Sequence, residues 1–72
     1  IREVAKTVDG VIDTEKCFVR KAGMQYYVDL HAAVDGKITV TEGHDISHKL
    51  KSALKKQIPE IAQVLIHIEP DE

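Results

Sequence analysis

The sequence has a single cysteine and no long run of apolar residues, and each absence excludes a class of protein. Cys17 has no partner for an internal disulfide, and one thiol excludes a four-cysteine zinc cluster. The uninterrupted apolar runs are a few residues long, so no segment is predicted to span a bilayer and direct membrane insertion is not expected. No secretory signal or transit segment is recognisable.

The sequence also lacks an excess of either charge. It carries 10 Lys and Arg against 12 Asp and Glu, a formal net charge of −2, so it lacks the excess of basic residues that binds nucleic acid.

A chain of 72 residues is one small domain. Folding buries only about 60% of the surface of such a chain, so we expect a dimer or a metal to support the core. Because the chain opens in a helical pattern without an initiator Met, we expect residues 1–72 to be a fragment of a longer protein.

Hydrophobic periodicity predicts five elements in the order α-β-β-α-β. Gly23 separates two strand patterns and indicates a hairpin, Thr39 with Glu42 forms a capping-box signature, and Pro59 ends the second helix. The expected elements are a helix over 1–8, strands over 11–22 and 25–35, a helix from about 40 to 58, and a strand over 61–69.

This order predicts an α+β fold. The last two strands are joined through a helix, and such a crossover makes them parallel. The expected architecture is a two-layer sandwich with two helices on one face of a three-stranded mixed sheet, similar to a ferredoxin-like fold that lacks its first strand.

Four histidines in so short a chain point to metal chemistry. His31 lies on the more polar side of the second strand, and His67 and Glu69, two residues apart, share one face of the last strand. If those strands are neighbours, the three side chains converge opposite the core. Two imidazoles and a carboxylate suit Zn²⁺, and also Co²⁺, Ni²⁺, Fe²⁺ or Mn²⁺. A lone histidine on a strand is more often a solvated residue, and it is the combination that favours a metal.

The remaining candidates carry weaker signals. His44, in the first helical turn, forms an H-x₃-H pair with His48, but such pairs on a polar face are usually coincidental, and we interpret His48 as a solvent residue. No Glu follows His44 as in a metalloprotease. Cys17 is expected to face inward as an inert thiol. Three aspartates are possible oxygen ligands whose ordinary role is solvated surface: Asp13, Asp29 and Asp35. No nucleophile–base pair or phosphate loop is present, so no enzyme is predicted.

Five strings, taken in order, resemble the C-terminal cytoplasmic domain of cation diffusion facilitator transporters, the zinc-efflux family. They are VDGV at 8–11, FVRKAG at 18–23, VDLHAAVDG at 28–36, EGHDIS at 42–47 and VLIHIEP at 64–70. The resemblance covers almost the whole chain, and the closing IHIEP and the helix histidine are its most specific parts.

The resemblance implies a homodimerising domain on the cytoplasmic face of the cell membrane. It would be attached to a membrane-embedded part that exchanges divalent cations for protons, and would bind zinc or another divalent metal near the dimer interface to regulate transport. By motif it assigns His31, His44, His67 and Glu69 as ligands, with Glu69 in place of the usual Asp. Metal-binding members have another histidine shortly after the Gly-Val turn, where this chain has Asp13 as a possible substitute.

Two other functions compete with this interpretation. The domain could be a purely structural dimerisation module whose histidines are incidental. It could also be a small-molecule-binding ferredoxin-like domain, although the Gly-rich loop expected for that role is missing.

Overall fold

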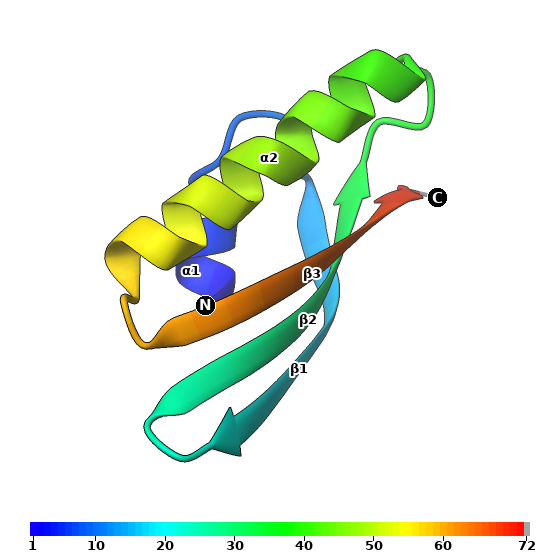
Figure 1. The fold of residues 1–72 in the computed structure, drawn as a ribbon. Coiled ribbons are helices and arrows are strands. Elements are labelled where there is room, and N and C mark those ends of the chain that lie inside the picture. The colour runs from blue at the N-terminus through cyan, green and yellow to red at the C-terminus, as the bar shows by residue number, and fades with distance from the viewer. Residues whose placement is uncertain (72) are drawn as a thin grey trace.

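The computed structural model describes residues 1–71 and has five elements in the predicted order (Figure 1). These are α1 (Arg2–Lys6), β1 (Asp13–Ala22), β2 (Gln25–Val34), α2 (Val40–Gln57) and β3 (Ile61–Pro70). The α-β-β-α-β order is therefore confirmed, and the element bounds differ from the predicted ones mainly at the first helix and the first strand.

The three strands form one mixed sheet in the order β1-β2-β3. β1 and β2 are antiparallel and are joined by a two-residue turn in which Gly23 has a φ of 63°, a conformation that favours glycine. β2 and β3 are parallel, as the helical crossover between them requires. β2 therefore lies in the middle of the sheet and contributes the most buried residues.

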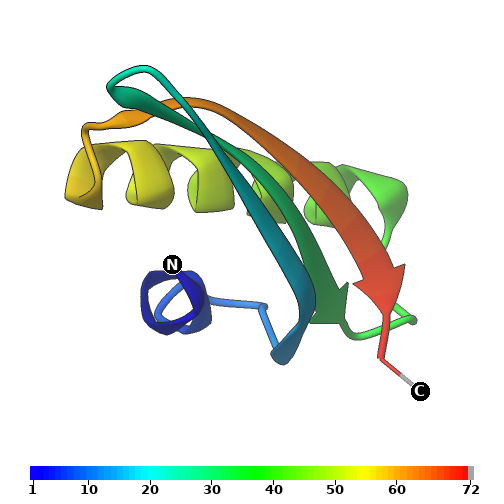
Figure 2. The same cartoon turned by 90° about the horizontal axis from the view of Figure 1, so that it is seen from below.

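Both helices cover the same face of the sheet (Figure 2). The core between them is built from alternate residues of β2 and one stripe of α2, and its largest fully buried side chains are Leu30, Leu50 and Leu54. The start of α2 is fixed by the predicted capping box, because Thr39 Oγ1 accepts from the Glu42 amide at 3.0 Å and Glu42 Oε1 accepts from the Thr39 amide at 3.2 Å. The predicted two-layer architecture is confirmed.

The first helix and first strand are shorter than the periodicity predicts. α1 ends at Lys6 rather than at Val8, and the Thr7 hydroxyl donates to the Val4 carbonyl at 2.6 Å just beyond its last turn. The chain then turns at Gly10, whose φ is 98°. β1 begins at Asp13, two residues later than predicted.

A β-bulge at Glu15 determines which β1 side chains face the helices. The register with β2 shifts between Thr14 and Lys16, so Thr14 pairs with Ala32 on the buried face and Lys16 pairs with His31 on the opposite face.

Among residues 1–71, no helix is both long and apolar enough to cross a membrane.

Candidate metal centre

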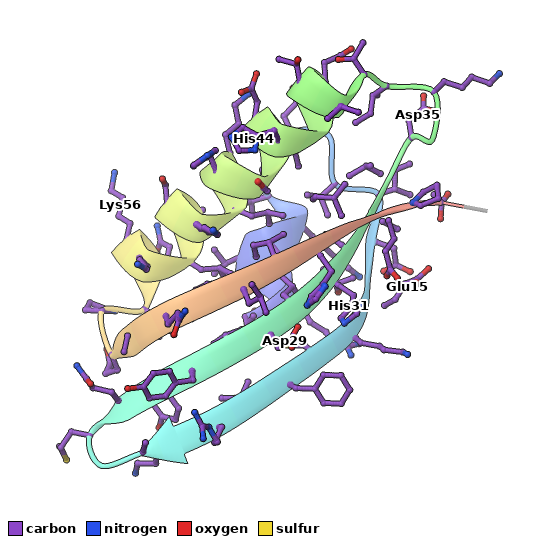
Figure 3. The ribbon with its side chains drawn as sticks, turned by 45° about the vertical axis from the view of Figure 1, so that its right-hand side comes forward. Glu15, Asp29, His31, Asp35, His44 and Lys56 are labelled. Atoms are coloured by element: carbon purple, nitrogen blue, oxygen red, sulfur yellow. The ribbon has the colours of Figure 1, made fainter. Side chains whose placement is uncertain are left out.

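The sheet face opposite the helices, here called the outer face, gathers polar side chains from two neighbouring strands. Val28 and Leu30 of β2 face the core, so the residues between and after them, Asp29 and His31, face outward. The parallel register pairs His31 with His67. Figure 3 shows Asp29 and His31 together on the sheet.

The imidazole rings of His31 and His67 stack on each other. Their centroids are 4.3 Å apart and their planes differ by 10°. This spacing follows from the register, because directly paired residues on neighbouring strands lie about 4.8 Å apart. The two rings are therefore held parallel by the sheet itself.

Asp29 brings a carboxylate to the same point. Its Oδ1 lies 2.8 Å from Nε2 of His67 and 3.7 Å from Nε2 of His31. One ligand atom from each of these three residues falls within 4.8 Å of the others. We call this set the sheet cluster.

Two atoms of the sheet cluster make no hydrogen bond. Asp29 Oδ1 and His67 Nε2 are shielded from solvent, and neither has a hydrogen-bond partner of acceptable geometry within the described residues, despite their 2.8 Å separation. Buried polar atoms normally have a hydrogen-bond partner, and these two atoms meet each other only as a charge pair. A carboxylate oxygen and two imidazole nitrogens fit a divalent transition metal.

Glu69 contacts His31 from the neighbouring row of the sheet. Its Oε2 lies 3.2 Å from Nδ1 of His31. With the proton on Nδ1, His31 donates to this carboxylate and keeps the Nε2 lone pair on the side of Asp29. A carboxylate behind a metal-binding histidine commonly plays this part, because it fixes the ring tautomer and raises ligand basicity. In this geometry Glu69 supports His31.

The sheet cluster is open on one side. The side chain of His31 is 21% exposed, whereas those of Asp29 and His67 are 43% and 42% exposed. Three protein donors with an open approach leave room for a further ligand, such as water or a group from another chain.

Three candidate ligands lie outside the sheet cluster: Glu69, described above, and also His44 and Asp13. His44 is on α2 (Figure 3), where it lines a cleft of about 510 Å³ shared with Glu69, and its closest polar side-chain contact is His48. Asp13, at the start of β1, accepts from the Thr14 amide at 2.8 Å and forms a 3.8 Å ion pair with Lys6. Within one chain, the structure thus unites His31, His67 and Glu69 but not His44 or Asp13.

Asp29 is the member of the cluster to which sequence reasoning gave too little weight. The signal was present, since the clean alternation of the second strand places Asp29 and His31 on one face. Cys17 faces inward as predicted, because it pairs with Leu30 and packs, half-buried, against the core.

Comparison with known proteins identifies the family. The family described as "cation efflux protein, cytoplasmic domain" matches residues 1–71. Metal tolerance protein 2 of Oryza sativa is 35% identical over 68 residues, covering 94% of this chain and 18% of that protein. The manganese efflux system protein MneP of Bacillus subtilis is 29% identical over 62 residues, covering 86% of this chain and 21% of that protein. The chain thus spans only about a fifth of the length of these relatives.

Solved structures share the whole fold. A cadmium form and a nickel form of MamM CTD variants each superpose with a TM-score of 0.96 at 25% identity, covering 99% of this chain and 89% and 90% of theirs. The match of nearly every residue to the family, and of the complete fold to these domains, leads to one assignment. The chain belongs to the cation diffusion facilitator family of cation efflux proteins and corresponds to its cytoplasmic domain.

Proposed function

We propose that this domain binds a divalent transition metal on its outer face and regulates a cation efflux transporter as a dimer. The observation that carries the proposal is the convergence of Asp29, His31 and His67 within 4.8 Å. The two shielded, unpaired atoms of this cluster support it, because a metal would satisfy both at once. Residues 1–72 would form one domain of a longer membrane protein, located at the cytoplasmic face of the membrane and attached to the part that carries out cation/proton antiport.

Zinc is the metal that we propose for the sheet cluster. Two imidazoles and one carboxylate, with an approach left open, form a donor set that Zn²⁺ favours. The same donors accept other divalent ions, and the names of similar proteins include manganese, cadmium and nickel. Glu69, His44 and Asp13 stay predicted as further ligands; His44 lines the same cleft as Glu69, whereas Asp13 lies at the start of β1.

The partner in the dimer is proposed to be a second copy meeting the outer face. Asp29 is flanked in its row of the sheet by Phe18 and Leu65, which are 59% and 51% exposed. These side chains help line a groove of about 320 Å³ beside the cluster. Large apolar side chains on an outer sheet face favour burial against a partner, and a core this small gains from it.

The regulatory mechanism follows from linkage. If Asp29, His31 and His67 hold metal more tightly in one arrangement of the two protomers, a rise in metal concentration shifts the population toward that arrangement. The helix α1 at the N-terminal end of the domain would pass the change to the rest of the transporter.

Calorimetric titration with Zn²⁺ tests the metal role. We expect the wild-type domain to bind Zn²⁺ and a His31→Ala/His67→Ala variant to lose that binding, with circular dichroism verifying the fold of both. Equal affinities, or no binding to either, would contradict metal sensing. Sedimentation with Zn²⁺ and with chelator separates the alternative of a purely structural dimerisation domain, which would remain an unchanged dimer in both.

A further inference from the structure

Most basic residues of the chain lie in two segments that contain no acidic residue. Residues 46–59, which form the second half of α2 and the start of the following turn, hold four lysines. Residues 16–28, which form most of the β1–β2 hairpin, hold two lysines and an arginine. Positive charge is therefore concentrated in a chain whose net charge is −2.

Strand register brings the ends of both segments to the same end of the molecule. The β1–β2 turn leads into Tyr26, which pairs with Ile61 at the start of β3, and α2 ends at Gln57 just before that strand. The hairpin turn and the last turn of α2 lie at the same end in Figure 1, and Figure 3 shows Lys56 there. We call this end, which includes residues 20–26 and 55–61, the turn end.

Four exposed cations at the turn end have no acidic partner. They are Arg20, Lys21, Lys55 and Lys56. Among residues 1–71 none of the four forms an ion pair, and Glu60, the acidic residue between α2 and β3, is not within ion-pairing distance of any of them. The negative end of the α2 dipole favours the two lysines of its last turn, but it does not account for the pair on the hairpin.

Aromatic rings hold the two hairpin cations in place. The guanidinium of Arg20 lies 5.1 Å from the ring centre of Tyr27, and the ammonium of Lys21 lies 5.9 Å from that of Tyr26. A cation–π contact fixes the position of a cation but leaves its charge uncompensated. Met24, at the tip of the same hairpin, is 85% exposed. The hairpin thus presents two fixed cations beside an exposed apolar side chain.

The opposite end of the molecule is acidic. Asp9, Asp35, Glu42 and Asp45 line a groove of about 270 Å³ near the start of α2, and Asp71 follows the end of β3. The molecule extends 40 Å along its longest axis and 19 Å across. Because charge is separated between the two ends, a domain of negative net charge still presents one positive end.

We propose that the turn end docks on anionic lipid headgroups at the surface of the membrane. The contact is peripheral and deepens the proposed function, on which it rests, because that function places the domain at the membrane and connects it through α1. The N-terminus of α1 lies toward the turn end (Figure 2). Each Lys or Arg near an anionic leaflet adds to the attraction, and side chains with an apolar body and a polar tip, such as tyrosine, favour the headgroup region. Docking by this end leaves the acidic end facing away from the lipid.

Sedimentation of the domain with sucrose-loaded vesicles tests this contact, in chelator so that metal plays no part. Vesicles of phosphatidylcholine and phosphatidylglycerol in roughly equal parts should carry the domain down at low salt, and vesicles of phosphatidylcholine alone should not. Binding should fall as salt is added, because salt screens the attraction. Lys21→Gln/Lys56→Gln should weaken it by about fivefold for each cation removed. Both side chains are exposed, so the fold should persist, and circular dichroism verifies it.

A matched control removes the same charge away from the turn end. Lys16 pairs with His31 farther along the sheet and Lys37 lies in the turn before α2, so Lys16→Gln/Lys37→Gln should retain most of the binding. The proposal is overturned if the wild type binds both kinds of vesicle equally or binds neither, if the two double variants lose equal affinity, or if duplex DNA is bound more tightly than anionic vesicles. The Zn²⁺ titration is a separate measurement: a domain that binds Zn²⁺ but no vesicle keeps its proposed metal role and loses the docking alone.

Discussion

His31 and His67 stack face to face, 4.3 Å between ring centroids, although 36 positions separate them in the chain. The contact exists because a parallel pairing aligns the two histidines in one row of the sheet. Asp29, one outward position earlier on β2, then reaches the nitrogens of both rings. The proposed metal centre is thus a product of strand register rather than of a local sequence motif.

Replacing Asp29 by Asn should lower metal affinity. The substitution removes the carboxylate charge that lies 2.8 Å from Nε2 of His67 and 3.7 Å from Nε2 of His31. Zn²⁺ affinity, measured by competition with a chelating dye, should fall by at least about tenfold, because outer-shell changes alone cost that much. Retained affinity would show that Asp29 is not a ligand.

Replacing Glu69 by Gln separates a positioning role from a ligating one. If Glu69 only orients His31 through Nδ1, the amide oxygen of Gln can still accept that proton, and Zn²⁺ affinity should fall by about 10- to 100-fold without a change in stoichiometry. Glu60→Gln is the matched control, since Glu60 is an exposed carboxylate in the turn before β3, and it should leave the titration unchanged. A loss of one metal equivalent would instead make Glu69 a direct ligand.

The sequence specified the sheet cluster more completely than the ends of the elements. Alternation over 25–35 places His31 on the outer face, and the i, i+2 spacing places His67 and Glu69 on one face, so their meeting required only that β2 and β3 be neighbours. Two features could not be predicted from these patterns. The first is the β-bulge at Glu15, which inverts the inward and outward alternation of side chains within β1 and which strand alternation alone does not reveal.

The position of His44 relative to the cluster is the second feature beyond reach of periodicity. The helical pattern correctly gives a polar face, but it does not say which sheet face that side chain can reach. In the structure α2 covers the inner face of the sheet, so His44 meets His48 rather than His31. Within the single chain His44 lines the same cleft as Glu69, an arrangement that helical periodicity alone does not give.

Substitution of the helix cap should weaken the fold without touching the metal ligands. Thr39→Ala removes the hydroxyl that accepts from the Glu42 amide and donates to Glu42 Oε1, whereas the Thr39 amide can still donate to Glu42 Oε1. The expected cost is about 1 kcal/mol in the free energy of unfolding. In thermal unfolding this corresponds to a fall in Tm of about 4–8 °C for a domain of this size. Protein concentration must be held constant, because dimerisation makes Tm depend on it. Thr39→Ser, which keeps the acceptor, should lose much less.

Replacing Gly10 by Ala should destabilise the domain. The Gly10 φ of 98° disfavours any L-residue, and a Cβ there would lie 2.7 Å from Cδ1 of Ile46, a buried residue of α2. Gly10→Ala is therefore expected to cost about 1–3 kcal/mol in urea titrations. Gly23→Ala isolates the backbone part, since Gly23 also has a positive φ, of 63°, but has no atom within 4 Å of an added Cβ. If the two variants lose equal stability, the contact with Ile46 contributes nothing.

The proposed dimer should depend on the apolar side chains that flank Asp29. Phe18 and Leu65 are exposed in the single chain and stand on either side of the sheet cluster, so a charge there would oppose burial against a second copy. We expect Phe18→Glu and Leu65→Lys each to shift the sedimentation profile from dimer to monomer and to remove any dependence of the dimer on Zn²⁺. Met24→Glu is the matched control, because Met24 is an apolar residue that is 85% exposed in the hairpin turn. A dimer that survives both outer-face charges, or that is lost equally in the Met24 variant, would place the interface elsewhere. Zinc affinity measured on the monomeric variants then separates the two roles of this face: a cluster complete within one chain keeps its affinity, and one that borrows ligands from the partner loses it.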